Sequence, residues 1–139
     1  MASKLNPYIN FNGNAKQAIE FYKTVFGGIL TMSTFKDSGM PCEESDAHKI
    51  MHAMLIAENG MMLMVSDAPP GMPHTPGNNI SISLSGDDEK ELRGYWDTLS
   101  NGGTIVVPLE KAPWGDTFGM LTDFFGISWM VNIAGVQKT

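Results

Sequence analysis

Apolar residues recur at helical spacing in the stretch that begins at Ala15. They are three or four positions apart and fall on one face of a helix: Ala15, Ala18, Ile19, Tyr22, Val25 and Phe26. Residues 12–14 (Asn-Gly-Asn) precede the stretch as a turn and N-cap signal, and Gly27-Gly28 follows it as a stop signal. The pattern predicts an amphipathic helix over Ala15–Phe26.

A second stripe of the same kind lies much later in the chain, at Leu92, Tyr95, Trp96 and Leu99. Asp88 precedes it as an N-cap, and Glu91 follows three residues on, as in a capping box. Residues 101–103 (Asn-Gly-Gly) end the pattern. We therefore expect a second amphipathic helix.

Short apolar or alternating stretches around these helices predict eight strands. In the first half of the chain they cover residues 8–11, 29–35, 50–57 and 61–66. In the second half they cover residues 80–85, 104–109, 118–123 and 127–133.

The two halves repeat one another. The helix segment 21–25 (Phe-Tyr-Lys-Thr-Val) is echoed 74 positions later at 95–99 (Tyr-Trp-Asp-Thr-Leu). A strand–turn–strand segment, 54–65, is echoed 66 positions later at 120–131, with Met-Leu, Gly and Met-Val at the same internal spacing. The spacings of 74 and 66 differ by eight residues, which the polar stretch 36–48 accommodates. The pattern predicts a duplicated module.

Each half reads β-α-β-β-β and predicts an α+β fold. The first module covers about residues 5–67 and the second about 79–134. Residues 68–78 form a linking loop, since their prolines and glycines are incompatible with regular structure. One module alone cannot bury both its helix face and its curved sheet face. We therefore expect residues 1–139 to fold as one domain.

Composition and charge narrow the possible partners. Hydrophobic residues make up 42% of the chain, charged residues 17%, and the formal net charge is −6 with scattered lysines and arginines. Nucleic acids and anionic membrane surfaces need a basic stripe, so we expect neither as a partner. The longest apolar run, residues 61–65, is too short to span a bilayer. A single cysteine, Cys42, excludes an intramolecular disulfide, and we expect a cytoplasmic protein.

Six segments resemble the vicinal-oxygen-chelate superfamily, which includes glyoxalase I, extradiol dioxygenases and bleomycin-resistance proteins. They are residues 7–14 (PYINFNGN), 18–23 (AIEFYK), 51–54 (MHAM), 64–68 (MVSDA), 114–119 (WGDTFG) and 123–132 (DFFGISWMVN), and they are most similar to the PhnB-like branch. The resemblance implies an eight-stranded, cup-shaped pair of mixed sheets with helices outside, and a twofold homodimer. This branch is often described as a ubiquinone-pathway methyltransferase, but the sequence contains no glycine-rich nucleotide loop after a strand.

The resemblance also implies where a metal would lie. Metal-binding relatives use His, Gln or Glu from four strands, and the corresponding positions here are Pro7 or Tyr8, Met64, Asn79 and Met130. Proline, two thioethers and an amide are a poor ligand set for a hard divalent ion. A shift of one position would place Leu63, Val65, Trp129 or Val131 there instead, and none of these is a ligand. We therefore expect neither a metal nor another cofactor.

Two residues are candidates for acid–base chemistry, His52 within a strand and Asp116 in the turn before the seventh strand. A structural histidine is the simpler explanation of His52. With Cys42, Glu43, Glu44 and Asp46 it would form a rearranged metal site, although loop acids are more often solvated. The acids beside Cys42 disfavour its thiolate and hence a nucleophilic role.

A cup between the sheets would be lined by residues from both modules. The 11 methionines of the chain suit an adaptable apolar cavity, or simply fill the core. Trp114 is either an aromatic lid or a rim contact. The expected ligand pocket consists of Tyr8, Asn10, His52, Met54, Met64, Asn79, Ser81, Trp114, Phe118, Met130 and Asn132.

Three functions are compatible with these features. The first is a metal-free protein that binds a small, mostly apolar molecule in the cup. The second is an enzyme, a lyase, isomerase or dioxygenase, with displaced metal ligands or with His52 and Asp116 as acid and base. The third is a dimeric scaffold without a ligand.

Overall fold

The computed structural model describes residues 3–39, 41–69 and 71–135. The chain divides into two compact units, residues 1–76 and 77–139. The boundary falls within the predicted linking loop 68–78. That the two units fold as one domain stays a prediction, as does the origin of the two modules by duplication.

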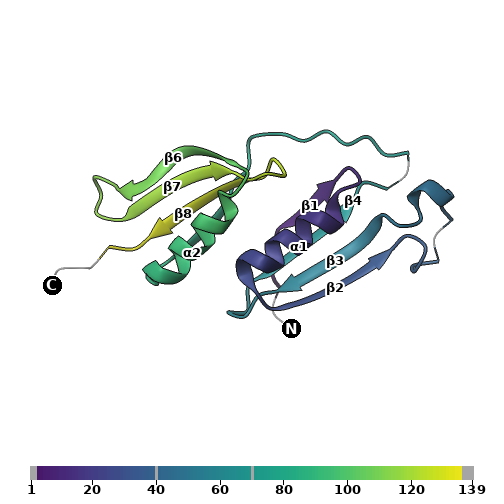
Figure 1. Cartoon of the computed structure of the whole chain (residues 1–139), viewed down its shortest axis with the longest axis horizontal. Coiled ribbons are helices and arrows are strands. Elements are labelled where there is room, and N and C mark those ends of the chain that lie inside the picture. Colours follow the sequence, from purple (N-terminus) through teal and green to yellow (C-terminus); the bar gives the residue numbers. More distant parts are fainter. Residues whose placement is uncertain (1–2, 40, 70, 136–139) are drawn as a thin grey trace. The chain divides into compact units, whose positions relative to one another are not determined.

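The first unit contains a four-stranded mixed sheet and one α-helix (Figure 1). Its sheet order is β1-β4-β3-β2, with β1 parallel to β4 and the other pairs antiparallel. Its elements are β1 (Tyr8–Phe11), α1 (Ala15–Phe26), β2 (Ile29–Thr34), the 3₁₀-helix η1 (Glu44–Asp46), β3 (Ile50–Ile56) and β4 (Met62–Asp67).

The second unit repeats this arrangement without the 3₁₀-helix. Its sheet order is β5-β8-β7-β6, with β5 parallel to β8. Its elements are β5 (Ile82–Gly86), α2 (Glu89–Leu99), β6 (Thr104–Lys111), β7 (Thr117–Thr122) and β8 (Ser128–Ile133). The predicted α+β fold of two βαβββ modules is confirmed. Among the described residues, neither helix is long and apolar enough to cross a membrane.

One predicted strand begins too early. The pattern placed its start at residue 80, but the first residue of β5 paired with β8 is Ile82, opposite Trp129. Ile80 is 78% exposed, and Asn79 and Ser81 precede the strand. Apolar character alone therefore does not mark the start of the strand, which depends on where the partner β8 begins.

The two hairpins have the same register, as their sequences predict. Met54 lies opposite Met64 in the first unit, and Met120 lies opposite Met130 in the second. Gly60 has a φ of 92° and Gly126 a φ of 87°, a left-handed conformation that glycine adopts without steric cost. The shared glycine is thus a requirement of the turn.

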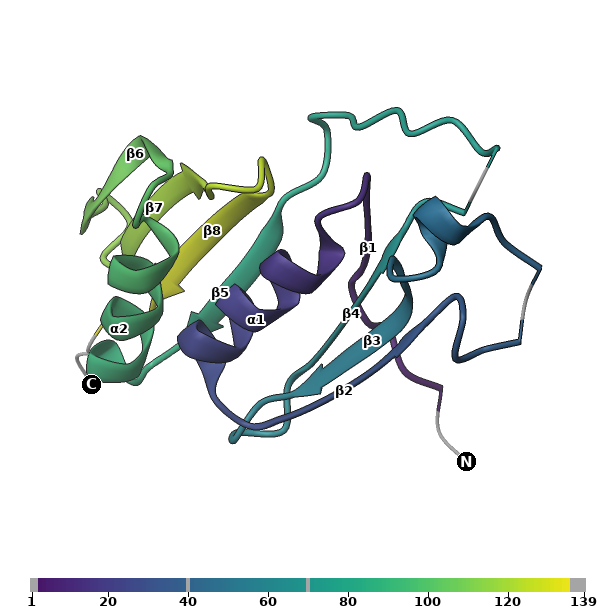
Figure 2. The same ribbon diagram turned by 45° about the vertical axis from the view of Figure 1, so that its right-hand side comes forward.

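Each helix packs on one face of its own sheet, α1 against β3 and β4, and α2 against β5 and β8 (Figures 1 and 2). The buried positions of α1 are the six predicted from spacing, and those of α2 are Leu92, Tyr95, Trp96 and Leu99. In the second unit the contact is close enough that a Cβ on Gly119 would lie 2.7 Å from Cη2 of Trp96. A large helix residue here requires a glycine on the strand below it.

The start of α1 is capped differently from the prediction. Asn14 occupies the N-cap position, but its side chain makes no capping hydrogen bond. Instead Oδ1 of Asp67, at the end of β4, accepts hydrogen bonds from the backbone N–H groups of Gly13 and Ala15, at 2.8 and 3.0 Å. Oδ2 accepts a third from Ile50 at 2.9 Å. The cap of α1 therefore comes from a distant strand.

The start of α2 is capped locally, as predicted. Oδ1 of Asp88 accepts a hydrogen bond from the backbone N–H of Glu91 at 3.0 Å. Glu89 and Glu91 place further negative charge in the first turn, where it interacts favourably with the helix dipole.

Candidate functional site

The first sheet has one face against α1 and one open face. Ala53, Leu55 and Val65 are buried in the core beneath α1. Because successive side chains of a strand point to opposite faces, the residues between them lie on the other side. This open face of the first sheet carries five residues of the predicted pocket: Tyr8, Asn10, His52, Met54 and Met64.

A row of predicted residues crosses this face. Tyr8 lies opposite Met64 on the parallel strand, and Met64 lies opposite Met54 on the antiparallel one. Directly paired side chains have Cβ atoms about 5 Å apart, so they are neighbours. The two thioethers form an apolar middle to the row.

Polar groups lie beside the methionines. Oη of Tyr8 is 3.3 Å from Nδ1 of His52, and the two rings are 5.8 Å apart between centroids. The hydroxyl of Ser66 donates a hydrogen bond to Oδ1 of Asn10 at 2.9 Å. This face therefore combines an apolar surface with a histidine that a phenol orients.

The open face of the second sheet lies on the side away from α2. It carries three predicted residues, Phe118, Met130 and Asn132, which alternate with buried neighbours such as Leu121, Trp129 and Val131. Its central pair, Met120 and Met130, repeats the pair of the first sheet.

Three further predicted residues lie outside the strands of the second unit. Trp114 is 63% exposed, and its ring makes an edge contact with Phe118 at 5.8 Å between centroids. Asn79 and Ser81 precede β5, so the prediction that they lie on a strand is wrong.

Asp116 is already engaged by hydrogen bonds. Its Oδ2 accepts one from the side-chain amide of Asn132 at 3.0 Å, and its Oδ1 accepts one from the backbone N–H of Gly135 at 2.9 Å. Both bonds lower the pKa of the Asp116 carboxyl below its ordinary value, and the bond from Asn132 has the larger effect. A carboxylate stabilised in this way is a poorer proton acceptor. The geometry favours His52 over Asp116 as a base.

The positions that hold metal in relatives need one correction. The strand pairing places Ser83 opposite Met130, just as Tyr8 lies opposite Met64. The fifth-strand position is therefore Ser83, and the assignment to Asn79 is wrong because Asn79 precedes the strand. A serine hydroxyl beside two thioethers is also a poor set for a hard divalent ion.

The described residues do not form the rearranged metal site that His52 would share with the residues of the loop 42–46. Within residues 3–39, 41–69 and 71–135, no group of three or more His, Cys, Asp or Glu side chains could hold a metal ion. Asp46 instead binds Lys49, with 2.8 Å between Oδ1 and Nζ. This hydrogen bond raises the pKa of the Lys49 ammonium group.

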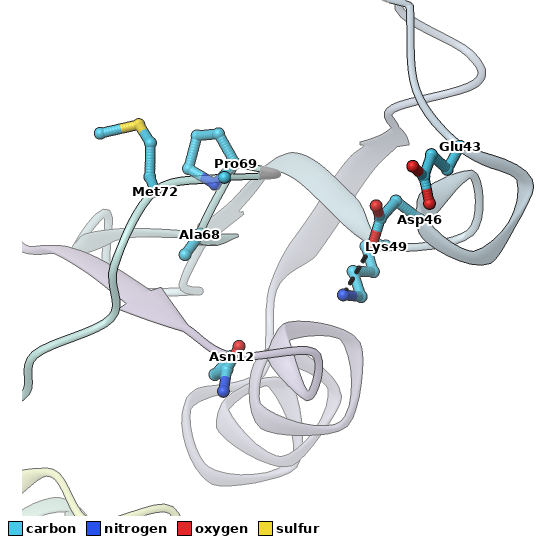
Figure 3. A pocket seen from close by; sticks show the side chains of 8 residues that line it. Asn12, Glu43, Asp46, Lys49, Ala68, Pro69 and Met72 are labelled. Atoms are coloured by element: carbon cyan, nitrogen blue, oxygen red, sulfur yellow. Dashed lines mark ion pairs between the residues drawn. The ribbon is translucent and has the colours of Figure 1, made fainter.

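A cavity of about 340 Å³ in the first unit was not predicted. Figure 3 shows Glu43, Asp46 and Lys49 on one side of it and Ala68, Pro69 and Met72 on the other. The residues come from three separate segments of the chain, so no local pattern in the sequence could have indicated it. Its walls place an ion pair opposite apolar side chains.

The fold and these two open faces define a class of protein. The crystal structure of a glyoxylase/bleomycin resistance protein/dioxygenase domain from Frankia sp. EAN1pec matches with a TM-score of 0.66 at 12% identity, covering 100% of this chain and 96% of that one. At such low identity the likeness shows the fold alone. That fold is the one of the vicinal-oxygen-chelate superfamily.

Residues 3–132 match the model of the family described as 3-demethylubiquinone-9 3-methyltransferase, and the chain belongs to this family. The crystal structure of protein PA1353 from Pseudomonas aeruginosa is 38% identical, with a TM-score of 0.86 and coverage of 97% of this chain and 100% of that one. A putative 3-demethylubiquinone-9 3-methyltransferase, PhnB protein, from Bacillus cereus is 27% identical, with a TM-score of 0.75 and coverage of 95% and 100%. The predicted resemblance to the PhnB-like branch is confirmed.

Proposed function

We propose that this protein binds a small, mostly apolar molecule without the help of a metal, on the open faces of its sheets. The observation that carries the proposal is the matched pair of methionines on each open face, Met54 with Met64 and Met120 with Met130. Thioether side chains are flexible and polarisable, so they adapt to varied apolar ligands. The neutral hydrogen-bonding groups beside them would fix the orientation of the ligand.

The methyltransferase named in the family description is not the function that we propose. The connections between strand and helix, residues 12–14 and 87–88, contain no glycine-rich loop of the kind that binds a nucleotide cofactor. In the first connection the backbone N–H groups of Gly13 and Ala15 already bind Asp67, so they are not available to a cofactor.

Two measurements test the proposal. Native mass spectrometry of freshly purified protein should show a bound small molecule, and metal analysis should show far less than one equivalent per chain. One tightly held metal equivalent whose removal by a chelator abolishes ligand binding would contradict it.

Matched variants locate the site with 2-methylnaphthalene as a fluorescent apolar probe. Met64→Gln and Met130→Gln keep the length of the side chain but place an amide in the apolar row, so each should weaken binding about tenfold. Met72→Gln is the control, because Met72 is 61% exposed and lines the separate 340 Å³ cavity. Loss of binding in Met72→Gln alone would place the ligand in that cavity.

The second candidate is an enzyme, a lyase, isomerase or dioxygenase of the superfamily type, with His52 as the base. The contact between Tyr8 and His52 supports it, since a hydrogen bond at one ring nitrogen orients the other. His52→Ala should abolish any turnover that is found, whereas Asp116→Asn should retain it. Full activity in His52→Ala would end this alternative.

We also propose a cytoplasmic homodimer. One of the two edge strands of the second sheet, β6, exposes Ile105, Val106 and Val107 at 50, 59 and 37%. An apolar edge strand readily pairs with a second copy. Cys42 has a free thiol, which suits a reducing compartment. Sedimentation should show a dimer at micromolar concentration, and a Val106→Lys variant should sediment as a monomer.

A further inference from the structure

The imidazole of His52 has one engaged and one available nitrogen. Nδ1 lies 3.3 Å from Oη of Tyr8. Nε2 has no hydrogen-bond partner among the residues that the structure describes. The ring is half-buried on the open face of the first sheet, beside Met54 on the same strand.

The tautomer of His52 decides what the available nitrogen offers. When the Tyr8 hydroxyl donates its hydrogen to Nδ1, the proton of the neutral imidazole resides on Nε2. His52 then presents an N–H donor to the open face. When the ring is protonated, Nε2 remains a donor and carries positive charge as well.

The surroundings favour an acceptor oxygen as the partner of this donor. The other described side chains around His52 on this face are those of Ser33, Asn10, Ser66 and Met54, and none of them is charged. Asp67, the only carboxylate within β1 to β4, is buried and binds the N–H groups at the start of α1, so it does not face a ligand on the open face. The neighbouring thioethers would hold the apolar part of the same molecule.

We propose that His52 and Tyr8 recognise an acidic oxygen of the ligand, and that the ligand class is an apolar molecule with one carboxylate or enolate group. This inference rests on the proposed function and deepens it. The second module cannot supply the same recognition, because the positions matched to His52 and Tyr8 are Phe118 and Ser83. Recognition of the oxygen is therefore a property of the first module.

The experiment compares two probes of equal ring size, 2-naphthoate and 2-methylnaphthalene, by fluorescence titration of the full chain. The wild-type protein should bind 2-naphthoate at least about tenfold more tightly, as expected for a hydrogen bond to a charged group. His52→Phe introduces the residue that the second module has. It should remove this difference by weakening the binding of 2-naphthoate.

Two milder variants keep the test decisive if His52→Phe fails to fold. His52→Gln retains an N–H donor and should keep part of the preference for 2-naphthoate. Tyr8→Phe removes the group that orients the imidazole and should lower the affinity for 2-naphthoate by about threefold. Phe118→Leu is the matched control in the second module and should affect both probes alike.

The outcomes separate this inference from the function on which it rests. Equal binding of both probes, unaffected by any change at His52, would overturn the inference and leave an apolar binding site intact. Binding of neither probe would overturn both. A preference for 2-naphthoate that Met72→Gln abolishes and His52→Phe retains would also overturn the inference, since it would move recognition to the other cavity.

Discussion

The two modules have the same order of helix and strands, but the carboxylates that accept hydrogen bonds from their helix starts and turns lie at different positions. In the first module Asp67, on the last strand, binds three backbone N–H groups around the start of α1 and of β3. In the second, Asp88 caps α2 from the adjacent position. The position matched to Asp67 by the hairpin spacing is Ile133, which is buried but apolar.

A second difference lies at the other end of the sheets. Asp123, 4% exposed, accepts hydrogen bonds from the backbone N–H groups of Phe125 and Ile127 and from the indole of Trp129. The matched position in the first module is Ala57. Each module thus buries an aspartate, and the site differs because different turns leave different N–H groups without backbone partners. Buried donors must be paired, but the fold leaves open which side chain does so.

The largest expected effect is that of Asp67→Ala, which leaves three N–H donors without their acceptor. Since hydrogen bonds to charged groups contribute about 1.5–3 kcal/mol each and are not additive, we expect a loss of about 4 kcal/mol in the free energy of unfolding. Guanidinium denaturation followed by circular dichroism measures it. Asp67→Asn keeps one carbonyl oxygen and should lose about half as much. A loss below about 1 kcal/mol in Asp67→Ala would show that water replaces the carboxylate.

The next effect concerns how helix and sheet fit together. Gly119→Ala places a Cβ 2.7 Å from Trp96 and 2.9 Å from Cα of Leu109, and overpacking of this kind costs about 2 kcal/mol. The first module has Tyr22 and Ala53 at the matched positions. The double variant Trp96→Tyr with Gly119→Ala should therefore be more stable than the sum of the single changes predicts. If the changes in the free energy of unfolding of the two single variants simply added, the size of residue 96 would not explain the glycine at position 119.

Asp88→Ala should cost about 1 kcal/mol, the usual value for a local N-cap. The ratio between this loss and that of Asp67→Ala measures the difference between a local and a distant cap. Denaturation of both variants under the same conditions provides it. Equal losses would mean that Asp67 acts only as a helix cap and that its bond to Ile50 contributes little.

The smallest expected effect is a loss of stability at low pH. Hydrogen bonds lower the pKa of Asp116 in the folded protein, and those of the Thr34 backbone N–H and side chain lower that of Asp37. Because each folded-state pKa lies below the ordinary value of 3.8, the stabilisation is fully present above that pH. It is lost as the pH falls through the lowered pKa.

Melting temperatures measured between about pH 5 and pH 2 test this dependence. Asp116→Asn and Asp37→Asn should each melt lower than the wild type at pH 5, and the gap should narrow below the ordinary carboxyl pKa. The two aspartates lie in different modules, so the pair also shows whether acid weakens both. If the difference in melting temperature between variant and wild type widened towards low pH, the carboxyl pKa would be raised in the folded protein and not lowered.

Much of the fold could be predicted because its signals are local. The spacing of apolar residues located α1 and α2, and the paired Met-Leu, Gly and Met-Val segments located both hairpins. Asp88 was recognised as a cap because its partner is three residues away. Asp67 was not, because its partners lie in other elements, and neither composition nor spacing reports such a contact.

The candidate site was predictable to a lesser degree. Alternation along a strand places His52 and Met54 on one face, but the contact between His52 and Tyr8 depends on the register of the parallel pair β1 and β4. The register of the other parallel pair, β5 and β8, places Ser83 opposite Met130. Asn79 was misplaced because the start of β5 is set by its partner strand.

The origin of the cap on α1 has a consequence for the order in which the chain acquires structure as it is made. Ala15 and Asp67 are 52 positions apart, so the ribosome must release four strands before the first turn of α1 receives its acceptor. Asp88 emerges together with the helix that it caps. Closing a long loop costs entropy before the contact that it brings together contributes favourable free energy. We therefore expect pulsed hydrogen exchange during refolding to protect the start of α2 before that of α1, although α1 is synthesised first.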